Sequence, residues 1–296
     1  KIADESGFYS FHVSEHHATP LNLVPVPGVF LGAVARETRN MRLGPLCYLL
    51  PLYSPLRLIE EICILDHLSH GRLDVGVGRG VSPYELNYHN VDPQDSREIF
   101  EEALDAILNG LTNERLNHTG KHFSYSDVPM ELKPYQSPLP AIWYPSSSEA
   151  SSTWAGEKGY HYVTLGATEA ARPRIDAFKK GLVNGNGPLT PLEGFSGGAA
   201  IGIMRHMVIA ETEEEAMAAA RPAYDVWYAN LTKLQRANTK GTWKAGFTPP
   251  DLEAAIEAGS ILVGTPTHVL EKVAEHTGSL GINYMICAFY FGNINH

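Results

Sequence analysis

Short runs in which apolar and polar residues alternate are separated along the chain by longer segments with apolar residues every three or four positions. The first pattern is typical of strands and the second of amphipathic helices. Because the two patterns follow one another repeatedly, we expect an α/β fold in which helices connect parallel strands. Strands are expected at residues 9–14, 42–50, 73–77, 142–144, 160–165, 202–209 and 284–288.

The helical segments carry recognisable end signals. Thr212 precedes an acidic first turn, and Thr265 is followed by Pro266, so both threonines are expected to be N-caps. Gly110 is expected to end the helix that begins near Ser96. Further helices are expected at residues 23–38, 55–68, 152–157, 172–180 and 267–276.

Two segments, residues 181–198 and 233–250, lack clear periodicity. The strand and helix alternation resumes unchanged after each of them. We therefore expect one barrel domain over residues 1–296, with these segments as insertions and 233–250 as a mobile lid. A doubly wound open sheet is the competing architecture.

Composition limits the environment and the partners of the protein. The 296 residues contain 23 Lys and Arg against 33 Asp and Glu, a formal charge of −10, and no basic run stands out. We expect no nucleic-acid or membrane partner, and no apolar stretch approaches the roughly 20 residues of a membrane helix. Cys47, Cys63 and Cys287 form no paired framework, which indicates buried thiols in a reducing compartment and a cytoplasmic protein.

Ligands of parallel α/β folds bind beyond the carboxyl ends of the strands, so the residues after each strand are candidates for chemistry. Glu15-His16-His17 follows the first strand. The period of two places His16 on the polar face with His12, toward the interior of a barrel, where an imidazole can act as general base or hydrogen-bond donor. The alternative is a solvated loop histidine.

Two other strand ends have anion-binding character. In Gly78-Arg79-Gly80 the glycines let a ligand approach the backbone, and the arginine offers a forked cation to a phosphate or carbonyl. The serine-rich residues 145–153 supply hydroxyls and free N–H groups at a helix N-terminus, where phosphate can bind. The alternatives are an ordinary tight turn and a flexible surface loop.

Metal and thiol chemistry are not favoured by the sequence. Glu15, His12, His118 and His122 are potential ligands, but their spacing matches no helical zinc motif, and no metal site is expected. Cys47 lies within an apolar run, where a thiol is typically buried and inert.

Taken in order, the motifs resemble those of the bacterial luciferase-like flavin monooxygenases, and the similarity covers nearly the whole chain. The matching features are Glu15-His16-His17, residues 54–61, 65–73 and 76–80, the serine-rich turn before residues 154–159, Trp227-Tyr228, and residues 263–266.

The resemblance implies a luciferase-like TIM (β/α)8 barrel that binds reduced FMN at the carboxyl ends of its strands. Such enzymes receive reduced FMN from a separate flavin reductase, react it with O2 to a flavin hydroperoxide, and oxygenate a small organic substrate. The resemblance also implies site residues: His16 as catalytic residue; Leu46 and Cys47 beside the flavin ring, joined by a cis peptide; Gly78 and Arg79 in contact with flavin and phosphate; Glu85 close to the ring; and Ser147, Ser148 and Ser151 around the phosphate.

Other interpretations of the same scaffold stay open. One is a deazaflavin-dependent enzyme that transfers hydride without oxygen, and another is a non-catalytic flavin-binding subunit. We also expect a homodimer.

Because a barrel of this type has eight strands, and the chain starts in the helix before the second strand, we expect these 296 residues to lack the first strand and the last helix of a longer protein.

Overall fold

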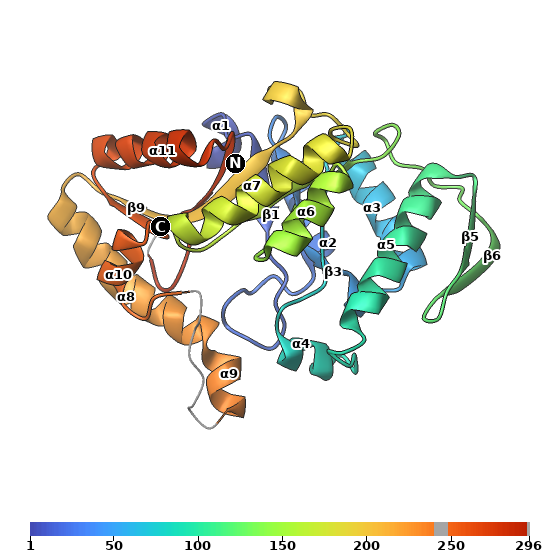
Figure 1. Cartoon of the computed structure of the whole chain (residues 1–296), viewed down its shortest axis with the longest axis horizontal. Helices are drawn as coiled ribbons and strands as arrows, with labels where there is room; N and C mark the ends of the chain where they lie inside the picture. The colour runs from blue at the N-terminus through green and yellow to red at the C-terminus, as the bar shows by residue number, and fades with distance from the viewer. Residues whose placement is uncertain (240–247, 295–296) are drawn as a thin grey trace. The chain divides into compact units, whose positions relative to one another are not determined.

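The structure is a computed structural model, and it describes residues 1–239 and 248–294. The chain divides into two compact units. Unit 1 consists of residues 1–18 and 22–145, and unit 2 consists of residues 19–21 and 146–296. Helices and strands alternate in both units (Figure 1), which confirms the α/β organisation expected from the hydrophobic pattern.

Unit 1 contains a helical N-terminus, strands joined by helices, and one hairpin. Its elements are α1 (Ile2–Glu5), β1 (Ser10–Val13), α2 (Pro27–Glu37), β2 (Arg42–Pro45), β3 (Tyr48–Leu49), η1 (Leu50–Leu52), α3 (Pro55–Leu68), β4 (Asp74–Gly78), α4 (Pro83–Tyr88), α5 (Ser96–Thr112), β5 (Arg115–Thr119), β6 (Ser124–Pro129) and β7 (Ala141–Pro145).

Unit 2 contains strands connected by longer helices. Its elements are α6 (Glu149–Glu157), β8 (His161–Thr164), α7 (Thr168–Asn184), η2 (Ser196–Gly198), β9 (Ile201–Ile209), α8 (Glu213–Leu231), α9 (Lys233–Asn238), α10 (Leu252–Glu257), β10 (Ile261–Gly264), α11 (Pro266–Leu280) and β11 (Tyr284–Ala288).

The strands of unit 1 pair in parallel, except in the hairpin. β1 pairs with β2, while β4 pairs with β3 and β7. Strand β4 is buried along its whole length, as expected of a strand covered on both faces. The antiparallel hairpin of β5 and β6 lies beside α5 (Figure 1), and it is not among the expected strands.

In unit 2, β9 is the central strand and pairs in parallel with β8, β10 and β11. Apolar residues of β9 and β10 pack against α8 and α10 in one buried cluster, and Met207 and Leu262 pack against Val269 of α11 in another. Helix α10 lies alongside α8 (Figure 1). The long helices thus cover the apolar faces of the short parallel strands, as the crossover pattern predicts.

The predicted caps are confirmed. Thr212 and Glu215 form a reciprocal capping box at the start of α8. The Thr265 side chain accepts a hydrogen bond from the backbone N–H of His268, and Pro266 takes the first helical position of α11.

Several element boundaries differ from the expectation, and three of them have a clear physical reason. The predicted strand 42–50 is wrong as one element, because β2 pairs with β1 whereas β3 pairs with β4. Helix α5 continues past Gly110 to Thr112. A side chain at Gly110 would meet Ile59 at 2.5 Å, so this glycine serves helix packing rather than termination. The helix expected from residue 23 begins only at Pro27, which occupies its first turn.

The segment predicted as a lid, residues 233–250, is described in part. Residues Lys233–Asn238 form α9, whereas residues 240–247 lie outside the described residues. The lid therefore stays a prediction. The sequence pattern does not predict strand β10, because its four residues, three apolar ones and a glycine, are too short a run for the periodicity to classify.

Candidate functional site

The histidines after β1 are connected to a carboxylate on a different element. His16 Nδ1 lies 3.3 Å from Oε1 of Glu85, and the backbone N–H of His17 donates to Oε2 of the same carboxylate at 2.8 Å. Glu85 comes from α4 and its side chain is only 5% exposed, whereas the His16 side chain is 25% exposed. The predicted residues His16 and Glu85 are thus brought together in unit 1, with part of the imidazole left accessible.

Glu15 is the second buried carboxylate of this cluster. One of its oxygens lies 2.8 Å from Nε2 of His17, and the other accepts hydrogen bonds from the backbone N–H of Leu49 and the hydroxyl of Tyr53, each at 3.0 Å. Burial and the neighbouring Glu15 carboxylate raise the pKa of Tyr53, so its hydroxyl stays protonated as a donor. Glu15 therefore ties the histidine motif to β3 and to the segment that follows η1.

The charge state of Glu85 follows from its partners. Burial by itself would raise the pKa of this carboxyl. The hydrogen bond and charge of His16, together with the N–H of His17, outweigh burial and hold the pKa of Glu85 below its ordinary value. Glu85 is consequently an ionised acceptor at neutral pH.

Leu46 and Cys47 lie between β2 and β3, next to β4. The peptide bond between them is cis, as the resemblance implied. A side chain at Gly78 would meet the sulfur of Cys47 at 2.3 Å, so glycine is required at this crossing. Burial, with a smaller effect of Glu15, raises the pKa of the Cys47 thiol, which agrees with the expectation of an inert sulfur.

Arg79 directly follows β4 and is exposed. Within residues 1–239 and 248–294, no hydrogen bond or ion pair engages its guanidinium. The next residue, Gly80, has a φ of +84°, a left-handed conformation that glycine adopts without strain. This turn leads into α4. The side chain of Ser82 caps that helix by accepting a hydrogen bond from the backbone N–H of Glu85.

In unit 2, the serine-rich turn forms the N-terminus of α6. Ser148 is the N-cap, and its hydroxyl accepts from the backbone N–H of Ser151. Ser152 turns inward and bonds the Tyr162 hydroxyl at 2.8 Å. Ser147 is exposed and Ser151 half-buried, and in the described part of the chain neither hydroxyl has a partner. The predicted phosphate serines therefore include one cap and two free hydroxyls.

The structure also reveals residues that the sequence analysis did not assign. Tyr53 joins the cluster through its hydrogen bond to Glu15. His89 joins it through an edge contact with His17, in which the two ring centroids lie 4.4 Å apart. For Glu15 itself, the sequence predicts no individual role beyond that of a potential metal ligand. The adjacency of Glu15 to two histidines was the one local signal of its role, since Tyr53 is 38 residues away in sequence.

The residues weighed as metal ligands have other partners. His118 lies within 3.5 Å of Glu102 and 3.4 Å of Asp105 on α5. The ring centroids of His12 and Trp143 lie 5.2 Å apart, and burial lowers the pKa of His12. Among the residues that the structure describes, no three His, Cys, Asp or Glu side chains are grouped as metal ligands.

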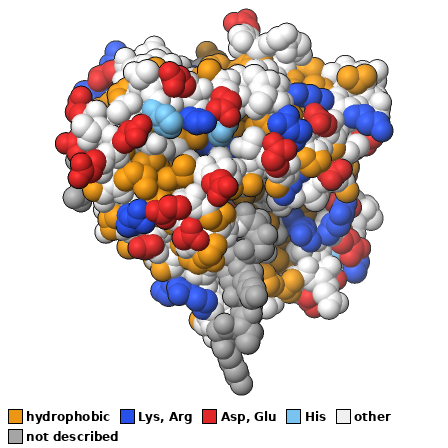
Figure 2. Space-filling model, turned by 60° about the vertical axis from the view of Figure 1, so that its left-hand side comes forward, with side chains coloured by type: hydrophobic (Ala, Val, Ile, Leu, Met, Phe, Trp, Pro, Cys, Tyr) orange, Lys and Arg blue, Asp and Glu red, His pale blue; other side chains and the backbone are white. Residues whose placement is uncertain are grey.

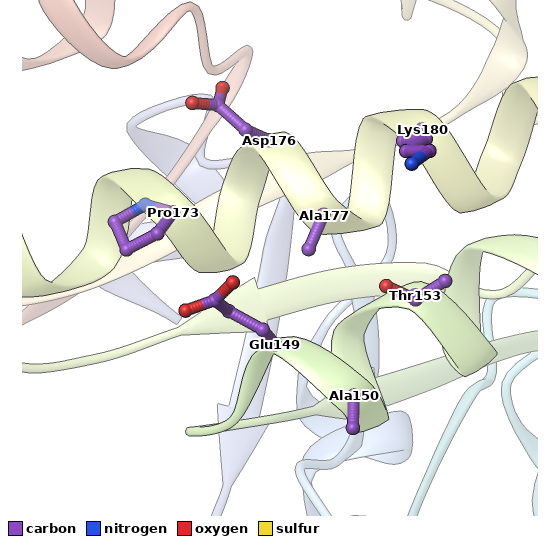
Figure 3. Close-up of a pocket in the computed structure, with 7 residues that line it drawn as sticks. All are labelled: Glu149, Ala150, Thr153, Pro173, Asp176, Ala177 and Lys180. Atoms are coloured by element: carbon purple, nitrogen blue, oxygen red, sulfur yellow. The ribbon is translucent and has the colours of Figure 1, made fainter.

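A groove on unit 2 lies between α6 and α7 (Figure 3). Figure 3 shows Glu149 and Thr153 of α6 facing Pro173 and Ala177 of α7 across it, and it is also lined by Ala150, Asp176 and Lys180. None of the predicted cofactor residues is among these seven. On the face drawn in Figure 2, acidic and basic side chains are interspersed, and no continuous basic patch is visible among the described residues.

Comparison with known proteins gives one family match and several similar sequences. The family model for luciferase-like monooxygenases matches residues 1–284. Protein y4wF of Sinorhizobium fredii, which is uncharacterised, is 35% identical over 303 residues, covering 99% of this chain and 84% of that protein. Limonene 1,2-monooxygenase of Rhodococcus erythropolis is 28% identical, over 94% of this chain and 71% of that enzyme. The oxygenase component of flavin-dependent trigonelline monooxygenase of Acinetobacter baylyi is 26% identical, over 80% and 66%.

Solved structures show the same fold. Monooxygenase RslO1 of Streptomyces bottropensis superimposes with a TM-score of 0.84 at 23% identity, covering 98% of this chain and 85% of that one. The oxygenating constituent of 3,6-diketocamphane monooxygenase of Pseudomonas putida, in complex with FMN, gives 0.80 at 22% identity, over 98% and 84%. Coenzyme F420 dependent tetrahydromethanopterin reductase of Methanopyrus kandleri gives 0.73 at 17% identity, over 97% and 86%.

The matches define an oxidoreductase class built on a TIM-barrel fold, which confirms the predicted fold class. The chain belongs to the luciferase-like monooxygenase family. Its relatives and structural neighbours include flavin-dependent monooxygenases and F420-dependent oxidoreductases. No helix within residues 1–239 and 248–294 is both long and apolar enough to cross a membrane.

Proposed function

We propose that the protein is an FMN-dependent monooxygenase that uses reduced FMN and O2 to oxygenate a small organic substrate, with His16 as its catalytic residue. The observation that carries the proposal is the imidazole of His16, held by the buried Glu85 carboxylate and still 25% exposed. An imidazole fixed at Nδ1 keeps Nε2 available to hold or move a proton.

Each unit, taken by itself, carries residues of the kind that reduced FMN requires. In unit 1, Arg79 is an exposed cation without a partner in the described chain, and it directly follows Gly78, which is buried against Cys47. A guanidinium such as that of Arg79 can donate to the carbonyl oxygens of a flavin ring or to its phosphate. In unit 2, Ser147, Ser148 and Ser151 at the start of α6 supply hydroxyl and N–H donors for the phosphate.

Reduced flavin, when bound, supplies the electrons that activate O2. We assign to Leu46 and Cys47 a position beside the flavin ring. We assign to His16 the role of holding a proton while oxygen reacts. A separate flavin reductase would supply the reduced cofactor, since the trigonelline relative is itself an oxygenase component. We further propose that the protein acts as a homodimer in the cytoplasm.

Replacement of His16 by Ala tests the catalytic assignment. Reduced FMN is bound anaerobically, oxygen is admitted by rapid mixing, and oxidised FMN and H2O2 are followed without substrate. We expect H16A to release both about 10-fold faster or more, because the proton-holding group is gone, and to oxygenate substrates more slowly. The dissociation constant of reduced FMN should change less than about twofold.

His67→Ala is the matched control, because His67 is an exposed histidine of unit 1 at the end of α3. It should behave like the wild type. Equal rates for H16A and wild type would remove His16 from the reaction. A wild-type protein that binds reduced FMN without changing its reaction with oxygen would instead support the non-catalytic flavin-binding interpretation.

The second candidate function is F420-dependent hydride transfer, which the structural likeness to an F420 dependent reductase favours. Anaerobic titrations with reduced FMN and with reduced F420 separate the two. We expect tighter binding of reduced FMN by about 10-fold or more. Preferential binding of F420, with hydride transfer in the absence of oxygen, would overturn the monooxygenase proposal.

A further inference from the structure

Both oxygens of the Glu85 carboxylate are already engaged by the protein. Oε1 lies 3.3 Å from Nδ1 of His16, and Oε2 accepts from the backbone N–H of His17 at 2.8 Å. The side chain is only 5% exposed. The carboxylate is therefore directed at the histidine motif, which sets it apart from the exposed cation of Arg79 nearby.

The chemistry of a carboxylate determines which ring nitrogen of His16 carries the proton. An ionised carboxylate can only accept hydrogen bonds, so Nδ1 must be the N–H donor toward Glu85. In the neutral imidazole the lone pair then belongs to Nε2. The adjacent His17 has the opposite arrangement, because its Nε2 lies 2.8 Å from the Glu15 carboxylate and must be protonated there.

The backbone around Glu85 is built to hold this position. Gly80, with its φ of +84°, turns the chain after β4, and Pro83 opens α4. The hydroxyl of Ser82 accepts from the N–H of Glu85 itself at 3.4 Å. The glycine-rich turn after β4 thus places a carboxylate against a histidine 69 residues away in sequence.

We propose that Glu85 is a positioning residue that fixes His16 in the Nδ1-protonated form and directs its Nε2 lone pair toward the reaction, rather than a residue that contacts the flavin ring. This proposal rests on the proposed function, because it assigns Glu85 an effect on the reaction only through His16. Glu85→Gln preserves the shape of the side chain but leaves a single acceptor oxygen. His16 Nδ1 and the N–H of His17 lie against different oxygens of Glu85, and in the amide one of these two positions becomes an NH2 donor that accepts from neither.

The first test measures the tautomer directly in the protein without cofactor. Two-bond 1H–15N spectra of protein labelled at histidine, assigned with H16A and H17A, should show His16 protonated at Nδ1 and His17 at Nε2 at neutral pH. In E85Q the His16 signal should move toward the Nε2-protonated form or a mixture, while His17 stays unchanged. A wild-type His16 protonated at Nε2 would overturn the proposal, even if E85Q failed to fold.

The second test is a double-mutant cycle on the reaction of bound reduced FMN with oxygen. E85Q should accelerate the release of H2O2 about 10-fold or more, since loss of a tautomer-fixing carboxylate can change rates by up to about 10⁴-fold in the hydrolase triad. In the H16A background the same change should alter the rate less than twofold. Reduced FMN should bind E85Q within about twofold of wild type.

Glu102→Gln is the matched control. Glu102 is another unit 1 carboxylate that accepts backbone N–H groups, those of Lys121, His122 and Phe123, in the hairpin turn. It should leave the His16 signal and the rate unchanged. Additive effects of E85Q and H16A would show that Glu85 acts independently of His16 and overturn the positioning role. If wild-type protein ignored reduced FMN altogether, the proposed function would fail while the tautomer test still stood.

Discussion

At the scale of single residues, two buried carboxylates organise the histidine motif after β1. Glu15 reaches β3 and Tyr53, whereas Glu85 reaches back from α4. Buried carboxylates are tolerated only when their oxygens are hydrogen-bonded, and both have at least two partners. The backbone and rings of His16 and His17 are consequently held from two sides before any ligand binds.

Cys47 is a potentially reactive group whose surroundings make it unreactive. Its thiol is buried and its pKa is raised, so little thiolate exists at about pH 8. We expect iodoacetamide to alkylate Cys47 in the native protein about 100-fold more slowly than in the urea-unfolded chain. Peptide mass spectrometry over time measures the rates.

Cys287 is the internal comparison, because it is only partly buried. It should react faster than Cys47 in the same native sample. Alkylation of native Cys47 at the rate of the unfolded chain would show that the thiol is accessible, and would reopen the nucleophile hypothesis.

At the scale of elements, the crossing of α6 and α7 depends on glycine. A side chain at Gly156 would meet the backbone oxygen of Phe178 at 2.3 Å, and one at Gly181 would meet that of Thr153 at 2.2 Å. The two helices therefore approach backbone to backbone. The groove in Figure 3 lies between the same helices, so its walls depend on this close contact.

Gly156→Ala tests that crossing. The added methyl group meets backbone that cannot move aside by rotamer change, and we expect a loss of about 1–3 kcal/mol in the free energy of unfolding. Urea denaturation monitored by circular dichroism measures it. Gly278→Ala in α11 is the matched control, because a methyl group added there would meet nothing within 4 Å; helix propensity predicts a gain of about 0.5–1 kcal/mol.

If G156A were as stable as wild type, the helices would have to separate without cost, contrary to the close packing of their backbones. A loss of similar size in G278A would point instead to a general intolerance of substituted helices in this protein.

At the scale of the whole molecule, the histidines His12, His206 and His276 make stability depend on pH. Burial lowers the pKa of His12 and lowers that of His206 to about 4. Burial also lowers the pKa of His276, and the charge of the nearby Arg205 adds to this effect. His276 Nδ1 accepts from Nε of the buried Arg205 at 3.2 Å, so its protonation would also remove an acceptor.

The sign follows from proton uptake. Below about pH 6.5 the unfolded chain binds protons that these folded imidazoles reject, so the free energy of unfolding falls as pH is lowered from about 6.5 toward 4. Above about pH 6.5 they contribute no pH dependence. His206 alone accounts for about 3 kcal/mol across that window, since each pKa unit is worth about 1.4 kcal/mol.

Urea denaturation at intervals between pH 7.5 and 4.5 measures this dependence. His206→Phe removes the titrating ring while keeping an aromatic side chain between Trp227 and Phe291, and its stability should fall less steeply than that of wild type. A wild-type stability independent of pH between 6.5 and 5 would contradict the prediction.

The sequence predicted features that depend on neighbouring residues. The alternation of strand and helix patterns, the caps at Thr212 and Thr265, and the placement of the histidine motif at a strand end all follow from local chemistry. The helix start was predicted wrongly although Pro27 in the first turn is itself a local signal. The role of Gly110 was predicted wrongly because a local rule for glycine does not include Ile59 of the helix that packs against it.

For the candidate site, too, local motifs were predictable from the sequence whereas contacts between distant residues were not. The order of its motifs along the chain was enough to place the protein in the luciferase-like family, since each motif is a short local pattern. Which carboxylate holds which histidine was decided only by tertiary structure. Glu85 and His16 are 69 residues apart, and Tyr53 and Glu15 are 38 apart. Such contacts exist only once parallel strands have brought distant strand ends together, which no periodicity along the chain encodes.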